Sequence, residues 1–89
     1  MSYRLMYTDK SIKQLKKMDY QAQRLITSYL RKLEQLEEPR SKGKALSSGL
    51  RGFWRYRIDD YRVICEINDV QIIVIVVDIG HRKDIYNRP

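Results

Sequence analysis

The segment "RGFWRYRIDDYRVICEI" (residues 51–67) decides the fold class of this chain. Two runs rich in aromatic and β-branched residues flank the acidic pair Asp59-Asp60. Such a pair suits a two-residue hairpin turn, because Asp tolerates a positive φ angle. The pattern therefore predicts two antiparallel strands, over residues 53–58 and 61–67.

This hairpin places like charges opposite each other. With a two-residue turn, Arg57 faces Arg62, and Arg55 faces Ile64 on the same side of the sheet. Opposed like charges destabilise a sheet, so the cluster indicates a site for an anion that removes the repulsion. Arginine suits phosphate, because its planar fork binds two oxygens at once. Two structural explanations stay open: a register shifted by one residue, or neutralisation by nearby acids. Those acids are Asp59, Asp60 and Glu66.

A second two-residue turn is predicted at Asn68-Asp69. It leads into an apolar strand over residues 70–78, which includes the run "IIVIVV". In this register Val70 lies opposite Ile67.

The first half of the chain predicts a short strand and two helices. The strand covers residues 3–7, and Thr8 or Asp9 can cap the first helix. Asp19 can cap the second helix, which Pro39 ends. Apolar residues recur at helical spacing in both helices. We therefore expect an α+β single domain over residues 1–89 in the order β-α-α-β-β-β. The expected sheet is mainly antiparallel and four-stranded, with a two-helix hairpin on one face and a short C-terminal turn or helix.

Alternation along the strands predicts one apolar face for the helices and one cationic face. The cationic face carries Arg55, Arg57, Arg62 and, beyond Ile79, His81. On this pattern Cys65 points into the core, where an inert buried thiol is expected.

Composition limits the possible partners. The chain has 89 residues, 43% of them hydrophobic, and one cysteine, so no intrachain disulfide forms and a reducing cytoplasm is expected. No signal peptide is visible, and the longest apolar run is too short to cross a membrane. The net charge is +7, and residues 40–62 contain seven basic residues against two acidic ones. This balance favours an anionic partner.

The chemistry-bearing residues point to RNA rather than to a metal or a cofactor. One Cys and one His cannot form a structural zinc site, and "KGKALSSG" lacks the spacing of a phosphate-binding loop. RNA carries its own nucleophile, the ribose 2′-OH, so a protein need only align it, stabilise charge on phosphorus and move protons. The loop over residues 40–52 supplies three predicted RNA contacts: Lys42, Lys44 and Arg51.

The sequence resembles the RelE branch of the RelE/ParE toxin superfamily. The resemblance rests on "LRGFWRYRIDDYRVICEI" (residues 50–67), followed by an apolar strand and "DIGHRKDIY" (residues 78–86). It covers nearly the whole chain. It implies the toxin of a type II toxin–antitoxin system, a ribosome-dependent endoribonuclease that cuts mRNA by 2′-OH attack. The implied partners are the ribosome with its mRNA and a RelB-like antitoxin, with operator DNA bound only through the antitoxin and no membrane.

The resemblance also implies roles for single residues. Arg55 and Arg57 match basic positions of the active-site strand, and Arg62 matches an arginine that stabilises the transition state. Arg82 matches a residue that assists the leaving group, and Tyr86 matches a tyrosine that contacts the message.

The sequence departs from the family pattern at one point. Relatives carry lysine where this chain has Arg55 and Arg57, and an arginine cannot act as a general base. His81 is therefore the candidate for proton transfer. Two other functions stay open at this point: a ParE-like inhibitor of DNA gyrase, and a nucleic-acid-binding module without catalysis.

Overall fold

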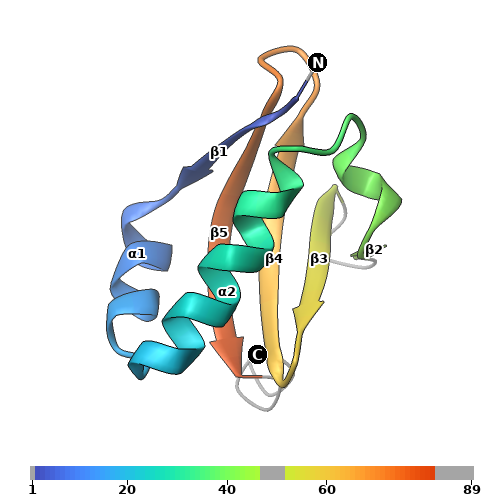
Figure 1. Ribbon diagram of the computed structural model, residues 1–89. Coiled ribbons are helices and arrows are strands. Elements are labelled where there is room, and N and C mark those ends of the chain that lie inside the picture. Colours follow the sequence, from blue (N-terminus) through green and yellow to red (C-terminus); the bar gives the residue numbers. More distant parts are fainter. Residues whose placement is uncertain (1, 47–51, 82–89) are drawn as a thin grey trace.

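The computed structural model describes residues 2–46 and 52–81. The elements follow one another as β1 (Arg4–Tyr7), α1 (Asp9–Lys16), α2 (Tyr20–Leu33), the 3-10 helix η1 (Pro39–Ser41), β2 (Lys44–Ala45), β3 (Phe53–Ile58), β4 (Tyr61–Asn68) and β5 (Ile73–His81). One five-stranded sheet has the order β1-β5-β4-β3-β2, with β1 parallel to β5 and the other neighbours antiparallel. Figure 1 shows α2 lying across the sheet.

The expected α+β class is confirmed, and the elements follow the expected order apart from one additional strand, so the four-stranded sheet is wrong. The expected C-terminal turn or helix lies outside the described residues. The fifth strand is β2, which lies within the segment expected to be a loop and pairs with β3. A two-residue strand leaves no readable alternation in a sequence, because its position depends on contacts with β3 rather than on its own residues.

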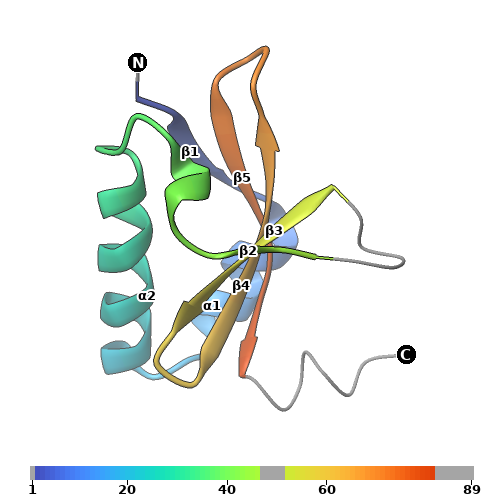
Figure 2. The same ribbon diagram turned by 90° about the vertical axis from the view of Figure 1, so that its right-hand side faces the viewer.

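Both helices begin at the predicted caps. The Thr8 side chain accepts a hydrogen bond from the Ser11 amide, and the Asp19 carboxylate accepts one from the Ala22 amide at 2.8 Å. Figure 2 shows α2 on one side of the sheet, while α1 is seen behind the strands, at the β5 end of the sheet. The face of β2, β3 and β4 that is opposite α2 carries no helix among the described residues.

The core lies between α2 and the sheet. Helix α2 contributes its buried stripe, which includes Ile26, Leu30 and Leu33, and the strands contribute Tyr56, Ile58, Val63, Cys65, Val74, Val76 and Ile79. The buried Tyr56 hydroxyl donates to the Pro39 carbonyl oxygen at 2.7 Å, so the only polar atom of that side chain is paired inside the core.

Helix α1 covers the part of β5 that β1 does not reach. β1 pairs with β5 from Ile73 to Val76, and beyond Val76 the side chain of Gln14 in α1 bonds to β5 in place of β1. Its amide oxygen accepts from the Ile79 amide at 2.8 Å, and its nitrogen donates to Asp78 at 2.6 Å. This side chain thus pairs an edge that would otherwise be open to other strands.

The first hairpin has the predicted register, and the second does not. Asp59 has a φ of 54°, and Arg57 lies opposite Arg62 as expected. The β4–β5 connection is longer than two residues, so Ile67 faces Val74, and Val70 is 92% exposed in the loop.

The side chain of Asn68 explains the longer second turn. Its oxygen accepts from the amides of Val70 and Gln71 at 3.0 and 2.9 Å, which closes a local turn before β5 begins. β5 then contains a bulge, since Cys65 faces Val76 while Ile64 faces Asp78. One extra residue on β5 reverses which face each later side chain occupies.

No helix among the described residues is long and apolar enough to cross a membrane.

Candidate active site

Cationic side chains from three neighbouring strands gather on one face of the sheet. Arg57 lies opposite Arg62, and Lys44 lies opposite Arg55. Residues directly opposite each other share a face, and so do residues two apart on one strand. All four cations therefore occupy the face that the helices do not cover.

These four side chains line one pocket of about 370 Å³. The remaining lining residues are Tyr29 and Gly43. Tyr29 comes from α2, so the pocket reaches past the edge of β3 toward the helix layer. Its ring also contacts the ring of Tyr56, with centroids 6.1 Å apart. The convergence of cations on one concave site, predicted for three arginines, is thus extended by Lys44.

The arginines differ in burial. Arg62 is only 5% exposed and donates from Nη1 to the Tyr61 carbonyl oxygen at 3.2 Å, whereas Arg57 is exposed. A buried guanidinium is costly unless it is well paired, because burial removes its hydration. Arg62 is therefore the anchored cation of the pocket, and Arg57 is the one that solvent or a ligand reaches.

The two structural explanations for opposed arginines do not apply. The register is not shifted, and among residues 2–46 and 52–81 no ion pair joins an arginine to Asp59, Asp60 or Glu66. Arg57 and Arg62 therefore lie opposite each other in the predicted register, and an anion bound between them would interact favourably with both guanidinium groups.

Gly43 allows β2 to approach β3 closely. It has a φ of 79°, and a Cβ atom there would collide with the Arg55 carbonyl oxygen, lie 2.7 Å from Trp54 Nε1 and lie 2.9 Å from the Tyr56 ring. Glycine is required for this backbone path. Just before it, the Lys42 carbonyl oxygen accepts a hydrogen bond from Trp54 Nε1 at 2.6 Å. Lys42 is absent from the lining of the arginine pocket and lines a small hollow beside α2 instead.

The expectation that His81 shares the face of the arginines is wrong. Tyr61 pairs with His81 and Val63 pairs with Ile79, and both Val63 and Ile79 belong to the core. Because the β5 bulge reverses the alternation, His81 lies on the helix side of the sheet. There its ring meets the Tyr61 ring edge to face, with centroids 5.8 Å apart. The catalytic role predicted for His81 stays a prediction.

Three other predicted site residues, Arg51, Arg82 and Tyr86, lie outside the described residues. Sequence reasoning missed two lining residues, Tyr29 and Gly43. Tyr29 precedes Leu30 of the apolar stripe of α2, and nothing in its own segment indicates contact with the edge of the sheet. The requirement for glycine at position 43 comes from β3 and leaves no signal in the local sequence.

Burial raises the pKa of two ionisable groups near the site. It raises the pKa of the Tyr29 hydroxyl above its ordinary value. Burial also raises the pKa of the Cys65 thiol to about 12. Cys65 is fully buried, as expected, and faces the core rather than the pocket. It is therefore not a nucleophile for this site.

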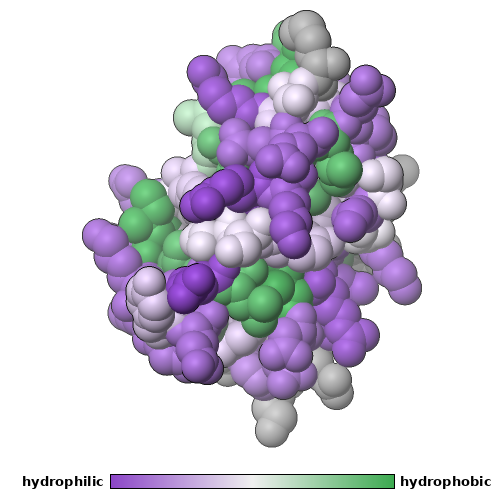
Figure 3. Space-filling model, in the orientation of Figure 1, coloured by the Kyte–Doolittle hydropathy of each residue, from purple (hydrophilic) through white to green (hydrophobic). Residues whose placement is uncertain are grey.

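The helix side of the molecule carries a different surface. Figure 3 shows apolar patches set among hydrophilic side chains on this side. One hollow of about 370 Å³ lies between β1 and the two helices. It is lined by Leu5, Tyr7, Ile12, Leu15, Thr27, Arg31 and Glu34.

Comparisons with known proteins agree with this architecture. Residues 5–86 match a family model described as the ParE toxin of the type II toxin–antitoxin system parDE. No curated protein sequence matches the chain significantly.

Several solved structures share the fold. A RelBE toxin–antitoxin complex from Mycobacterium tuberculosis is 24% identical, with a TM-score of 0.84 over 92% of this chain and 100% of that chain. An archaeal RelE–RelB complex from Pyrococcus horikoshii is 25% identical, with a TM-score of 0.72 over 92% and 97%. The isolated RelE toxin from E. coli is 16% identical, with a TM-score of 0.74 over 96% and 92%.

Proposed function

The chain belongs to the RelE/ParE superfamily of toxins from type II toxin–antitoxin systems, and from this premise we propose that it is a ribosome-dependent endoribonuclease acting on mRNA in the cytoplasm. The observation that carries the proposal is the pocket where Lys44, Arg55, Arg57 and Arg62 converge. A phosphodiester fits it, because its oxygens accept hydrogen bonds from guanidinium groups and its charge relieves their repulsion.

In the proposed reaction the ribose 2′-OH attacks the adjacent phosphorus. The new P–O bond forms as the bond to the 5′-oxygen breaks, which leaves a cyclic phosphate and a free 5′-hydroxyl. The transition state carries extra negative charge on the phosphoryl oxygens, where preorganised donors have their largest effect. Arg62 is held in place by its burial and suits this role, while Arg55, Arg57 and Lys44 would bind and align the scissile phosphate.

Other predicted residues have supporting roles in the proposal. Arg82 would assist the leaving group and Tyr86 would contact the message. Lys42 and Arg51 would bind flanking phosphates. His81 lies on the other side of the sheet end, so charge stabilisation by the arginines does not depend on it. A His81→Ala variant that keeps full cleavage across pH 5–8 would remove it from the proton-transfer step.

The test is cleavage of mRNA on programmed ribosomes by purified protein, beside a gyrase supercoiling assay. Arg62→Ala should lower the cleavage rate by about 10²-fold or more, the usual effect of losing one transition-state donor. Arg62→Lys should also lose most activity, because an ammonium cannot donate through a fork. Arg24→Ala removes an arginine from the solvent side of α2 and should cleave normally. Full activity of Arg62→Ala, or gyrase inhibition without cleavage, would refute the proposal.

We further propose that a RelB-like antitoxin binds this protein, since structural neighbours include RelE–RelB complexes. The hollow between β1 and the helices offers apolar side chains beside Arg31, and α1, which lines it with Ile12 and Leu15, also carries the basic residues Lys13 and Lys16. An amphipathic, acidic segment complements this surface. Ile12→Asp, which changes a residue of α1 that lines this hollow, should weaken antitoxin binding. Leu25→Asp changes an exposed apolar residue of α2 that does not line the hollow, and it should leave antitoxin binding unchanged.

A further inference from the structure

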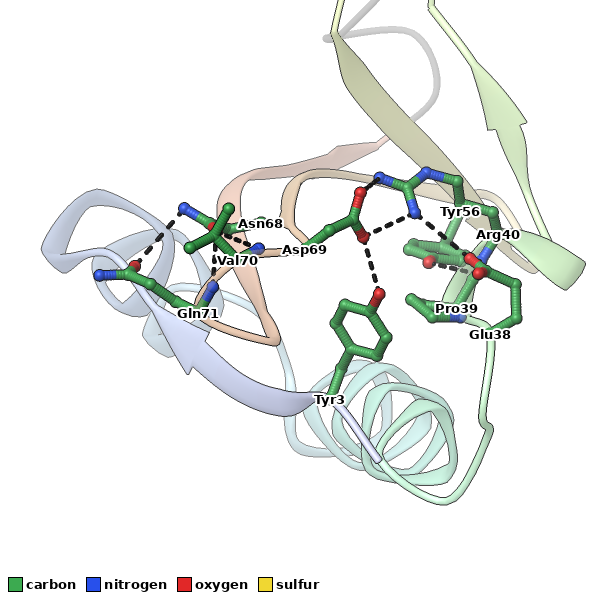
Figure 4. A network of polar contacts seen from close by, with 9 residues as sticks. All are labelled: Tyr3, Glu38, Pro39, Arg40, Tyr56, Asn68, Asp69, Val70 and Gln71. Carbon is green, nitrogen blue, oxygen red and sulfur yellow. Dashed lines mark hydrogen bonds and ion pairs between the residues drawn. The ribbon is translucent and has the colours of Figure 1, made fainter. Parts of the chain in front are cut away.

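An ion-pair network joins three distant segments at one end of the sheet (Figure 4). Arg40 binds Asp69 through two contacts, Nη1 to Oδ1 at 2.9 Å and Nη2 to Oδ2 at 3.0 Å. The Tyr3 hydroxyl donates to Asp69 Oδ1 at 2.7 Å. Glu38 accepts from the Arg40 amide at 2.9 Å and from its Nη1 at 3.3 Å. We call these four residues, Tyr3, Glu38, Arg40 and Asp69, the latch.

The latch fixes the segment that leads into β2. Glu38 caps η1 and Arg40 lies within it; Arg40 pairs with Asp69 of the β4–β5 loop, and Asp69 also accepts from Tyr3, which precedes β1. Beside them, the Pro39 carbonyl oxygen accepts from the buried Tyr56 hydroxyl. The path from η1 to β2 is therefore tied to the sheet by side chains on both sides of Pro39.

β2 needs this support because its own pairing is short. It pairs with β3 only at Lys44–Arg55 and Ala45–Trp54, with one further backbone bond from the Leu46 amide to the Phe53 carbonyl oxygen at 3.1 Å. Two residues of edge strand supply little stability on their own. Lys44 moreover lies opposite a like charge, which acts to push it away from Arg55.

We propose that the latch is a positioning device for RNA binding: Arg40, although basic and close to the cationic loop, does not contact RNA but holds Lys44 in the arginine pocket. This rests on the proposed ribonuclease function. A bidentate arginine–carboxylate pair with a third donor has the geometry for such a role, because it fixes direction as well as distance. The hydrogen bonds from Arg40 and Tyr3 lower the pKa of Asp69, as expected for a carboxylate that accepts charge-assisted bonds.

Charge alone and the latch predict opposite signs for Asp69→Ala. Removing a carboxylate makes the protein more cationic and would free Arg40, so simple charge attraction predicts tighter RNA binding. The latch predicts weaker binding. We expect the apparent KM for programmed ribosomes to rise about two- to tenfold in Asp69→Ala and Arg40→Ala, with kcat nearly unchanged. Glu37→Ala is the matched control, because it removes one negative charge, as Asp69→Ala does, from a residue next to the latch. Its KM should be equal to or lower than that of the wild type.

A cycle with Lys44 separates positioning from general destabilisation. Lys44→Ala should raise KM in the wild type but much less in the Asp69→Ala background, because Lys44 is already displaced there. A merely structural role for Asp69 would leave the effect of Lys44→Ala unchanged. An unchanged effect, or a lower KM in Asp69→Ala, would overturn the proposal.

Hydrogen exchange tests the latch without RNA. In Asp69→Ala the Leu46 amide should exchange faster, while the amides of Val63 and Val74 in the central strands keep their protection. Equal Leu46 protection in both proteins would overturn the proposal. If the wild type does not cleave RNA, the proposed function fails while the exchange experiment still decides whether the latch holds β2.

Discussion

Because Arg57 and Arg62 are like charges on opposed residues, we expect that replacing the exposed Arg57 makes the folded protein more stable. Arg57 is exposed and Arg62 is 5% exposed, and the two lie directly opposite on β3 and β4. Cross-strand like charges cost roughly 0.2–1 kcal/mol, and solvent around Arg57 puts this pair in the lower half of that range. We therefore expect Arg57→Gln to stabilise the protein by about 0.2–0.5 kcal/mol. For a domain of this size that corresponds to a rise in Tm of about 1–4 °C.

The assay is thermal unfolding followed by circular dichroism, at low salt and in about 1 M NaCl, where the Debye length falls to about 3 Å. The matched control is Arg4→Gln, which makes the same change in net charge on a strand of the same sheet. Arg4 lies opposite Ile73, so no like charge faces it. The gain of Arg57→Gln over Arg4→Gln should be present at low salt and shrink in 1 M NaCl.

Three outcomes would refute this reasoning: a Tm of Arg57→Gln at or below the wild type at low salt, an equal gain in Arg4→Gln, or a gain that high salt does not reduce. Inorganic phosphate supplies a second measurement. It should raise the Tm of the wild type more than that of Arg57→Gln, because a ligand stabilises in proportion to its affinity for the folded state. The more stable variant should also cleave message more slowly.

Three further predictions concern the elements around the pocket. In urea unfolding, Gly43→Ala should destabilise the protein by at least about 1 kcal/mol more than the control Gly52→Ala. Both glycines have a positive φ, but only Gly43 has other atoms close to where a Cβ would lie. Equal losses of stability would contradict the close approach of β2 to β3. The Cys65 thiol, with its pKa raised by burial, should react with a thiol reagent at pH 8 only at the rate of unfolding, and immediate reaction would show that it is not buried. Because the pKa of Asp69 is lowered in the folded protein, its carboxylate stabilises the fold above about pH 4, and this effect is lost as the pH falls further. The wild type should therefore have a higher Tm than Asp69→Asn at pH 6, and the difference should shrink as the pH falls to 3.

The part of the site encoded in local sequence could be predicted. Asp59 adopts the positive φ that a two-residue turn requires, and this turn fixes Arg57 opposite Arg62. No distant contact is needed to set that register, which is why the central feature of the pocket follows from the residues alone.

The rest depends on single side-chain contacts and on an irregular strand, which hydrophobic alternation does not report. The β4–β5 register is set by the Asn68 side chain, and the face of His81 is set by a bulge that the apolar run does not reveal. The position of β2 depends on the bond from Trp54 to the Lys42 carbonyl oxygen, on glycine at position 43, and on the bond from Tyr56 to Pro39 in η1 beside the latch. Period-two patterning cannot report any of these.

The geometry of the pocket also bears on the choice between RNA and a protein target. A partner such as gyrase would cover an extended surface, and burying four converging cations there would need four matched acids in one concave site of about 370 Å³. A phosphodiester supplies its acceptors within one group of the right size, and a polyanion brings further phosphates to Lys42 and the nearby loop. In the proposed reaction the negative charge beside Arg57 and Arg62 is greatest in the transition state, so the two opposed guanidinium groups would stabilise the transition state more than the bound message.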